Sequence, residues 1–305
     1  MKKILVIGSI NVDYASKVDV LPKGNEEINL DDSFARISGF GWNVANLLQQ
    51  LQVPYELLAP VGTGENGDLI RTVASRLNIP LHYTSDQIHG CTCTMIDSKG
   101  KISGMVVPGA EYNFPYYDLD EFDLNDYEAI ICSDLEMPNI FLEEYLQVLE
   151  SFEGNLYYVT SDHGMVMNED LRTMLFALRP ITIARPKEIL EFTSSDSKDA
   201  IDCARLLSLK TSRQVVMMQL SESYSIDAET IHGTEQEGEE IVDESGSMDA
   251  FGCAYMIAKE TGILEDKALS FASLCARLTA SSFETIPPQS ALQEIEEEFS
   301  NAILK

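Results

Sequence analysis

Short, continuous apolar runs alternate along the chain with longer segments of helical periodicity. The first run, residues 4–7, is closed by Gly8, a pattern typical of a strand buried on both faces of a parallel sheet. Comparable runs recur at 57–61, 129–132, 156–159, 181–184 and 215–218. Helical patterns separate them, at 43–51, 69–77, 141–152, 169–178 and 199–209. This order predicts an α/β fold with an open, mostly parallel sheet, helices on both faces, and ligands beyond the carboxyl ends of the strands.

Two segments, residues 12–37 and 90–113, interrupt this alternation and are typical of extended pairs. In the second segment the side chains of residues 91–96 alternate, and residues 97–100 (Asp-Ser-Lys-Gly) have the composition of a hairpin turn. We therefore expect one domain over residues 1–305. The two segments should form a small β-sheet that projects from it and serves as a lid over the ligand edge.

The composition bounds the possible partners. Hydrophobic residues make up 45% of the 305 positions, which is enough for a large buried core. Fifty acidic residues stand against 21 basic ones, and the formal charge of −29 makes nucleic acid and anionic membranes unsuitable partners. A bound nucleotide would need local neutralisation by backbone N–H groups, a cation or a few basic residues. We expect the acidic stretch 233–244 to be exposed.

The N-terminus and the cysteines predict a soluble, cytoplasmic protein. The first apolar run is too short for a signal peptide, and no segment approaches the ~20 apolar residues needed to cross a bilayer. None of the six cysteines forms a CxxC pair, so buried, reduced thiols are expected. Cys91 and Cys93 share one face of a strand, but no His or third Cys lies beside them to complete a zinc site.

The loop from Asp243 to Asp249 carries the clearest chemical signal. It is rich in small residues and precedes the helical run 251–259. A helix N-terminus of this kind offers unpaired N–H groups and the positive end of the helix dipole to a phosphoryl group. Asp249, at its edge, is placed to take a proton from an attacking hydroxyl. Taken alone, the pattern favours a simple N-cap role for Asp249.

The loop resembles the Asp-Thr-x-Gly-Ala-Gly-Asp signature of the ribokinase-like, or PfkB, family of carbohydrate kinases. Further segments resemble motifs of that family in the same order: Gly8-Ser9-Ile10-Asn11-Val12-Asp13, Ser38-Gly39-Phe40-Gly41-Trp42-Asn43, Val61-Gly62 with Gly64 and Gly67, Pro108-Gly109-Ala110, and Leu135-Glu136-Met137-Pro138. The ordered set covers nearly the whole chain. It implies a ribokinase-like fold and an ATP-dependent phosphotransferase acting on a hydroxyl of a sugar or nucleoside.

The resemblance also implies roles for individual residues. It makes Asp249 the general base and places the anion hole at Gly246, Ser247 and Met248. It assigns the substrate pocket to Asn11, Asp13, Gly41, Asn43 and Glu136, whose Asp and Asn side chains suit sugar hydroxyls. It assigns the nucleotide side to Lys187, Ser221 and Glu222. For Asn11 and Asn43, turn formation or helix capping is the alternative. The implied partners are ATP, Mg²⁺, optionally a monovalent cation, and a second copy in a homodimer through the projecting sheet; metal ligands remain unassigned.

Several positions depart from the family pattern. Met248 stands where the family has glycine, and its Cβ is expected to intrude on a phosphate or force an unfavourable φ. Glu244 replaces a threonine, and Phe40 replaces a lysine on the sugar side. On the nucleotide side, residues 187–190 lack the family's Asn-x-x-Glu, and residues 220–224 lack two glycines. A sugar-binding protein with weak or lost kinase activity is therefore the alternative function, followed by an oligomeric structural protein.

Overall fold

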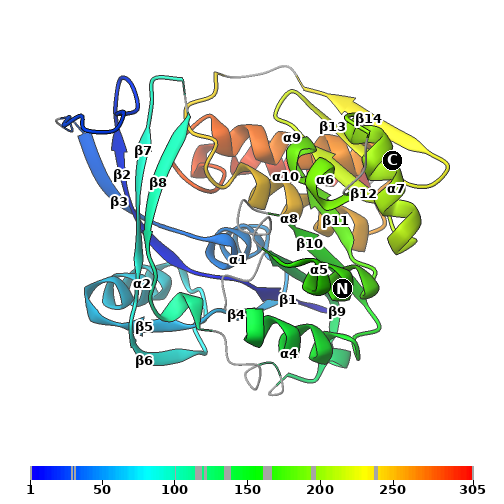
Figure 1. Cartoon of the computed structure of the whole chain (residues 1–305), viewed down its shortest axis with the longest axis horizontal. Helices are drawn as coiled ribbons and strands as arrows, with labels where there is room; N and C mark the ends of the chain where they lie inside the picture. Colours follow the sequence, from blue (N-terminus) through cyan, green and yellow to red (C-terminus); the bar gives the residue numbers. More distant parts are fainter. Residues whose placement is uncertain are drawn as a thin grey trace.

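The computed structural model describes residues 2–28, 30, 32–99, 101–113, 119, 122–133, 139–160, 167–193, 197–236 and 240–303. Its largest sheet has eight strands in the order β14-β13-β12-β11-β10-β9-β1-β4 (Figure 1). In chain order they are β1 (Lys3–Ile7), β4 (Tyr55–Leu58), β9 (Tyr127–Ser133), β10 (Asn155–Val159), β11 (Ile181–Ala184), β12 (Val215–Met218), β13 (Glu222–Ile226) and β14 (Ile231–Glu235). Neighbours from β4 to β12 are parallel, and β13 and β14 are antiparallel. The predicted mostly parallel α/β sheet is confirmed.

Helices cover both faces of this sheet because strands such as β1 are apolar on both sides. Ile4 and Val6 of β1 pack in one apolar cluster, whereas Leu5 and Ile7 pack in another. Residues of α1 (Phe40–Gln50), α2 (Gly64–Leu77), α8 (Ser247–Glu260), α9 (Glu265–Ala280) and α10 (Leu292–Ile303) join the first cluster. Residues of α4 (Asn139–Leu149), α5 (Glu169–Ala177), α6 (Pro186–Thr193) and α7 (Ala200–Thr211) join the second. Short 3₁₀ turns occupy Ala110–Tyr112, Leu124–Asp126 and Gln289–Ala291.

A second, four-stranded sheet stands beside the first and is drawn from both segments that interrupt the alternation (Figure 1). Its order is β3-β2-β7-β8, with β2 (Asn11–Lys17), β3 (Asp32–Ser38), β7 (Cys91–Ile96) and β8 (Ile102–Val107). We call these four strands the projecting sheet. A small parallel pair, β5 (Val61–Thr63) and β6 (Thr84–Ile88), lies at its base. Because β2 follows β1 after only three residues, the base of the projecting sheet lies at the carboxyl edge of the main sheet.

Two sequence expectations were wrong in detail. The apolar run 57–61 is not one strand, since β4 ends at Leu58 and β5 begins at Val61. Pro60 lies between them, and proline has no N–H to donate to a strand ladder. The stretch 233–244 is not exposed throughout, because Asp243 is completely buried. Its carboxylate pairs with Arg36, which lies 207 residues away in the sequence and leaves no local signal.

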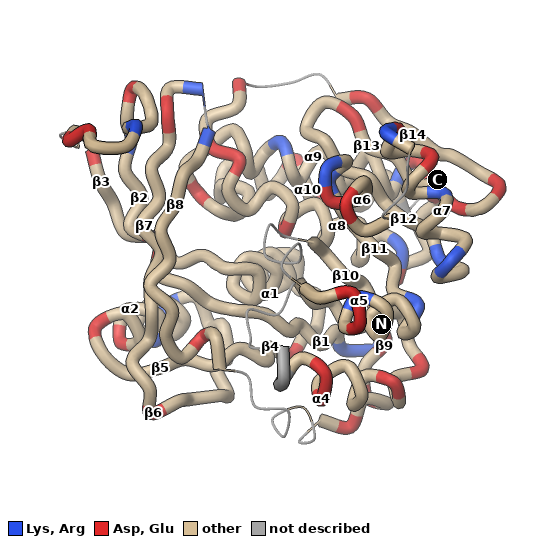
Figure 2. The backbone as a smooth tube through the Cα atoms, in the orientation of Figure 1, with Lys and Arg blue, Asp and Glu red and all other residues tan. Residues whose placement is uncertain are grey.

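The charged positions lie mainly on helices and loops around the two sheets (Figure 2). Acidic positions outnumber basic ones there, as the composition requires. Within the described ranges, no helix combines the length and the apolar character that a membrane crossing needs.

Candidate active site

Asp249 is held by a chain of side-chain hydrogen bonds from three elements. It lies in the first turn of α8, half-buried, and its Oδ2 accepts a 2.7 Å hydrogen bond from Asn43 Nδ2 in α1. The Asn43 Oδ1 atom in turn accepts a 2.7 Å bond from the Thr285 hydroxyl, in the segment after α9. Both Asn43 and Thr285 are buried. Because both polar atoms of the Asn43 side chain are used in this chain, its orientation and that of Asp249 Oδ2 are set together.

Burial raises the pKa of Asp249 to about 6. The hydrogen bond from Asn43 and the positive charge of Arg185 both lower this pKa, but they offset the loss of hydration only in part. A carboxylate with such a pKa is mostly ionised at neutral pH and is a stronger base than an ordinary aspartate. This suits a general base, whose pKa works best near the operating pH.

The loop from Asp243 to Asp249 exposes unpaired amides at the start of α8. Gly246 is the N-cap residue with φ +75°, and a Cβ added there would collide with the backbone carbonyl of Thr285. No described residue accepts a hydrogen bond from the N–H groups of Gly246, Met248 or Asp249. The N–H and the hydroxyl of Ser247 both donate to the Glu244 carbonyl, at 3.2 and 2.7 Å. The amides that remain for an anion therefore flank Ser247.

Met248 does not obstruct this loop as the sequence suggested. Its backbone is helical, and it is not among the described residues with positive φ. Its side chain is buried and belongs to the apolar cluster that also holds Phe251 and Val44. The steric objection to an anion site at this helix N-terminus is thereby removed.

A buried charged cluster lies between the projecting sheet and this loop. Arg36 of β3 faces Asp13 of β2 across the strand pair, and its Nε donates to Asp13 Oδ2 at 2.9 Å. The Arg36 Nη1 atom donates to Asp243 Oδ2 at 2.6 Å, and Nη2 donates to Ser245 Oγ at 3.2 Å. Asp13 is thus brought next to the loop that carries Asp249. Arg36 and Thr285 have no local sequence signal as members of the site, and Asp243 was expected only as the start of the loop; the arrangement follows from strand register and long-range packing.

The other substrate-side residues have different surroundings. Asn11 is half-buried at the start of β2, with its amide 3.5 Å from Ser9 Oγ. Gly41 lies in the first turn of α1, where an added Cβ would sit 2.7 Å from the Gly8 carbonyl oxygen. Its small size therefore serves the contact between α1 and the turn after β1, and its approach to a sugar stays a prediction. Glu136 lies outside the described residues.

The residues 1–292 match the model of the pfkB family of carbohydrate kinases. The chain belongs to this family. It is 23% identical over 288 residues to an ATP-dependent ribose-1-phosphate kinase of Halopiger xanaduensis, with 92% of each chain covered. Its structure is similar to a ribokinase of Thermotoga maritima (TM-score 0.81, 17% identity, 97% of this chain and 100% of the other). It is also similar to a nucleoside kinase of Burkholderia thailandensis in complex with inosine (TM-score 0.78, 14% identity, 99% and 98%).

This membership confirms the family, the ribokinase-like fold and the sugar-kinase class of enzyme that the sequence predicted. The individual site residues stay predictions. Of these, the structure brings Asp249 and Asn43 into direct contact. It also links Asp13 to the loop through the Arg36 guanidinium, which donates to Asp13 and to Ser245.

The nucleotide-side residues of this pfkB family member are at the same edge of the main sheet but outside that cluster. Lys187 is exposed on α6. Ser221 and Glu222 lie at the turn between β12 and β13, where the Glu222 carboxylate accepts hydrogen bonds from Gln219 Nε2 (3.0 Å) and Tyr224 Oη (2.8 Å). Their assignment to a nucleotide stays a prediction.

Next to Lys187, Glu188 is the buried acid of this segment. Its Oε2 accepts from the Thr160 hydroxyl at the end of β10 and from the Arg185 N–H at 2.8 Å. Because these contacts join the end of β10 to the start of α6, Glu188 stabilises the edge of the sheet. Within the described ranges, no group of three or more His, Cys, Asp or Glu side chains is placed to hold a metal ion.

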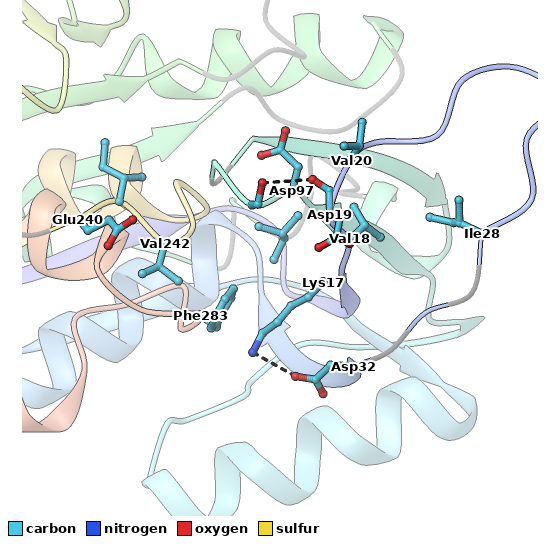
Figure 3. A pocket seen from close by; sticks show the side chains of 13 residues that line it. Lys17, Val18, Asp19, Val20, Ile28, Asp32, Asp97, Glu240, Val242 and Phe283 are labelled. Atoms are coloured by element: carbon cyan, nitrogen blue, oxygen red, sulfur yellow. Dashed lines mark hydrogen bonds and ion pairs between the residues drawn. The ribbon is translucent and has the colours of Figure 1, made fainter.

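A cavity of about 820 Å³ lies between the far end of the projecting sheet and residues 240–242 (Figure 3). Its walls include Lys17, Asp32 and Phe283. None of the predicted substrate residues that the structure describes lines it. The cavity is therefore separate from these residues, and Phe283, whose carbonyl accepts a hydrogen bond from Arg36, lines its wall.

The raised pKa of Asp249 predicts a pH profile. A general base acts when deprotonated, so kcat/KM should fall as the pH drops through about 6 and reach a plateau near pH 7 to 8. Steady-state rates between about pH 5 and pH 8, with thermal melts over the same range as the control for folding, measure this. A profile that stays flat through pH 6 would contradict the assignment.

Proposed function

We propose that the protein is an ATP-dependent kinase that transfers the γ-phosphoryl group to a hydroxyl of a sugar or nucleoside. The observation that carries this proposal is Asp249, a carboxylate with a pKa of about 6, fixed by Asn43 at a helix N-terminus with unpaired amides. The activities of the similar proteins support it, since they are a ribose-1-phosphate kinase, a ribokinase and a nucleoside kinase.

In the proposed reaction, the acceptor hydroxyl lies between Asp249 and the anion site. Its oxygen forms a bond to the γ-phosphorus, the bond from phosphorus to the β–γ bridging oxygen breaks, and ADP leaves. Asp249 Oδ1 takes the hydroxyl proton while Asn43 holds Oδ2. The N–H groups of Gly246, Met248 and Asp249 and the N-terminal dipole of α8 stabilise the negative charge on the transferred group. Catalysis of this kind rests on positioning and electrostatics.

Asp13 supplies the acceptor contact in this proposal. Its Oδ1 atom is buried, and no described residue donates a hydrogen bond to it. An unpaired buried carboxylate oxygen is costly, and a hydroxyl donor from a bound sugar would satisfy it. Asn11, at the start of the same strand, offers a side-chain amide for a neighbouring hydroxyl.

Mg²⁺ is proposed to accompany ATP. The described residues form no metal cluster, and Mg²⁺ is commonly held by substrate phosphates, waters and one or two carboxylates instead of a protein cage. Bound with the nucleotide, it would neutralise the phosphate oxygens. The unpaired amides at the start of α8 fit the same anionic ligand.

The test is an assay of ADP release with Mg²⁺-ATP over a panel of pentoses, hexoses, sugar phosphates and nucleosides. We expect turnover with one class that is at least about 100-fold above the background ATPase rate, in line with the contribution of one general base. If a sugar raises the melting temperature while Mg²⁺-ATP does not and no ADP forms, the alternative is supported: a sugar-binding protein without kinase activity. The Glu222 carboxylate on the nucleotide side favours that alternative, because it would repel an incoming phosphate.

We further propose that the protein works in the cytoplasm. All six cysteines are free thiols, four of them buried, which suits a reducing compartment.

The projecting sheet is proposed to act as a lid and as the contact of a homodimer. Its edge strand β8 is exposed along its whole length and carries Ile102, Met105, Val106 and Val107, with Met105 at 64% exposure. An open, apolar edge strand is stabilised by pairing with another chain. A second copy of the same strand would cover it.

Replacing Met105 and Val107 together by Lys should convert the dimer to a monomer, because both side chains stand on one face of β8 and the charges would repel across the contact. Analytical ultracentrifugation at micromolar concentration measures this. Leu209→Lys, at an exposed apolar position of α7, is the matched control and should leave the dimer intact. A wild-type chain that sediments as a monomer would contradict the proposal.

A further inference from the structure

Arg36 is surrounded by oxygens of the protein itself. Nε and Nη2 both lie 2.9 Å from Asp13 Oδ2, and Nη1 lies 2.6 Å from both Asp243 Oδ2 and the Phe283 carbonyl oxygen. The second contact of Nη2 is Ser245 Oγ at 3.2 Å. A guanidinium has five N–H groups; four of them donate hydrogen bonds in these contacts, and Nη2 also forms an ion pair with Asp13 Oδ2. All three nitrogens of the guanidinium therefore contact oxygens of the protein, an arrangement that does not favour Arg36 as a phosphate-binding residue.

The charges in this cluster explain why a guanidinium lies here. Arg36 is 8% exposed, Asp13 is 4% exposed and Asp243 is fully buried. Two buried carboxylates without a cation would be strongly destabilising, because isolated charges lose their hydration on burial. The two oxygens that converge on Nη1, one carboxylate and one carbonyl, are also ligands that a small monovalent cation takes. The side chain therefore fills a position where a soluble cation would otherwise be needed.

The same contacts join three parts of the molecule. Arg36 and Asp13 belong to the projecting sheet, Asp243 and Ser245 belong to the loop before α8, and Phe283 follows α9. Lys17, at the end of β2, adds a second contact, since its Nζ lies 3.9 Å from the centre of the Phe283 ring while pairing with Asp32 at 3.1 Å (Figure 3). Movement of Asp13 is thereby coupled to the loop that carries the base.

Arg36 also decides which oxygen of Asp13 is left without a hydrogen-bond partner. Both of its contacts go to Oδ2, and Oδ1 is left without a donor among the described residues. A carboxylate free to rotate would present either oxygen. With Oδ2 held from two nitrogens, only Oδ1 is available to a hydroxyl.

We propose that Arg36 is a positioning residue that serves as the built-in cation of the active site. It orients Asp13 toward the acceptor hydroxyl, couples it to the loop before α8, and makes the site independent of soluble monovalent cations. The inference deepens the proposed kinase function and rests on it for its effect on turnover. In this proposal the Arg36 side chain takes the place of the optional monovalent cation that the family resemblance implied.

The first test uses stability and needs no activity. Arg36→Met should lower the melting temperature by about 10 °C, because it leaves two buried carboxylates unpaired. Asp243→Asn added to Arg36→Met should recover part of this loss, although Asp243→Asn alone destabilises. A melting temperature of Arg36→Met within about 2 °C of wild type, or no recovery in the double variant, would overturn the proposal.

The second test measures turnover on the acceptor that the wild-type enzyme phosphorylates, and chemical rescue of a variant. Replacing K⁺ and Na⁺ by tetramethylammonium should leave wild-type turnover unchanged. Arg36→Ala should raise the acceptor KM by about 10- to 100-fold, the range for a lost hydrogen bond to a charged group, with a smaller effect on the KM for ATP. Low millimolar guanidinium should restore the acceptor KM of this variant, and tetramethylammonium should not.

The outcomes separate this inference from the proposed function. A wild-type chain with no turnover on any acceptor contradicts the kinase proposal. The melting temperatures of Arg36→Met and of the double variant with Asp243→Asn still decide the structural role of Arg36. The proposal that Arg36 is the built-in cation is overturned if wild-type turnover depends on K⁺. It is also overturned if Arg36→Ala has an unchanged acceptor KM. Arg36→Lys completes the series, because it keeps the charge but replaces the three nitrogens of the guanidinium, which contact Asp13, Asp243 and Ser245, by a single one.

Discussion

Replacing Asp249 by Asn should reduce kcat by about 100- to 10,000-fold, the contribution of a general base. The substitution keeps the shape of the side chain, and its amide oxygen can still accept the hydrogen bond from Asn43. What it removes is the ability to take a proton from the acceptor hydroxyl. Steady-state kinetics on the wild-type acceptor measure this, and acceptor KM should change little because the pocket stays intact.

The control for this prediction is the thermal stability of the Asp249→Asn variant. The native pKa of Asp249, about 6, lies above its ordinary value of 3.8, so the fold favours the protonated form. The stabilisation is fully present below the unfolded pKa and is lost as the pH rises through about 6. Asp249→Asn removes a buried charge and should therefore melt at or above the wild-type temperature at pH 8.

Asp170→Asn is a matched variant for the same experiment. Asp170 also lies in the first turn of a helix, α5, but it is exposed and far along the chain from the site. It should have wild-type turnover. Equal turnover in Asp249→Asn and wild type would remove Asp249 from the mechanism and leave it as a helix-capping residue.

Gly246→Ala should be the second most damaging substitution. With φ +75°, alanine is strained at this position, and its Cβ would push against the Thr285 carbonyl. Displacing Thr285 disturbs its hydrogen bond to Asn43 and, through Asn43, the orientation of Asp249. The substitution should also shift the amides of the loop. We therefore expect kcat to fall by about 100- to 1,000-fold, the effect of losing one anion-hole donor.

Gly262→Ala separates this effect from backbone strain. Gly262 has a similar φ of +80°, but an added Cβ would meet nothing within 4 Å. Both variants should melt at lower temperature, since alanine is strained in the left-handed region. Only Gly246→Ala should lose turnover. If the two variants have the same kcat, the loop geometry does not contribute to catalysis.

The strands were the most predictable part of the fold. β11 and β12 begin and end where the apolar runs 181–184 and 215–218 do, because a strand buried on both faces needs an apolar residue at every position. Helix bounds were less accurate, as for α1, which begins at Phe40 and not at residue 43. Its first turn is buried against the turn after β1, and burial in that turn does not follow helical periodicity.

The site was predictable only where its signal was local. Asp249 could be nominated because a small-residue loop before a helical run is a local pattern. The sequence also suggested that Met248 would force an unfavourable φ in the loop; the backbone there is helical, and the side chain packs in the core. Nothing local connected Thr285 to Asn43, because 242 residues separate them.

The sequence by itself determined the family, the alternation of strands and helices, and the loop that nominates Asp249. These properties follow from local periodicity and from short motifs in order. Only the tertiary structure decided that Asn43 holds Asp249 and that Arg36 balances both Asp13 and Asp243. The physical reason is that a buried charge must find its counter-charge in space, and the strand register and helix packing that bring the two together are set by the whole chain.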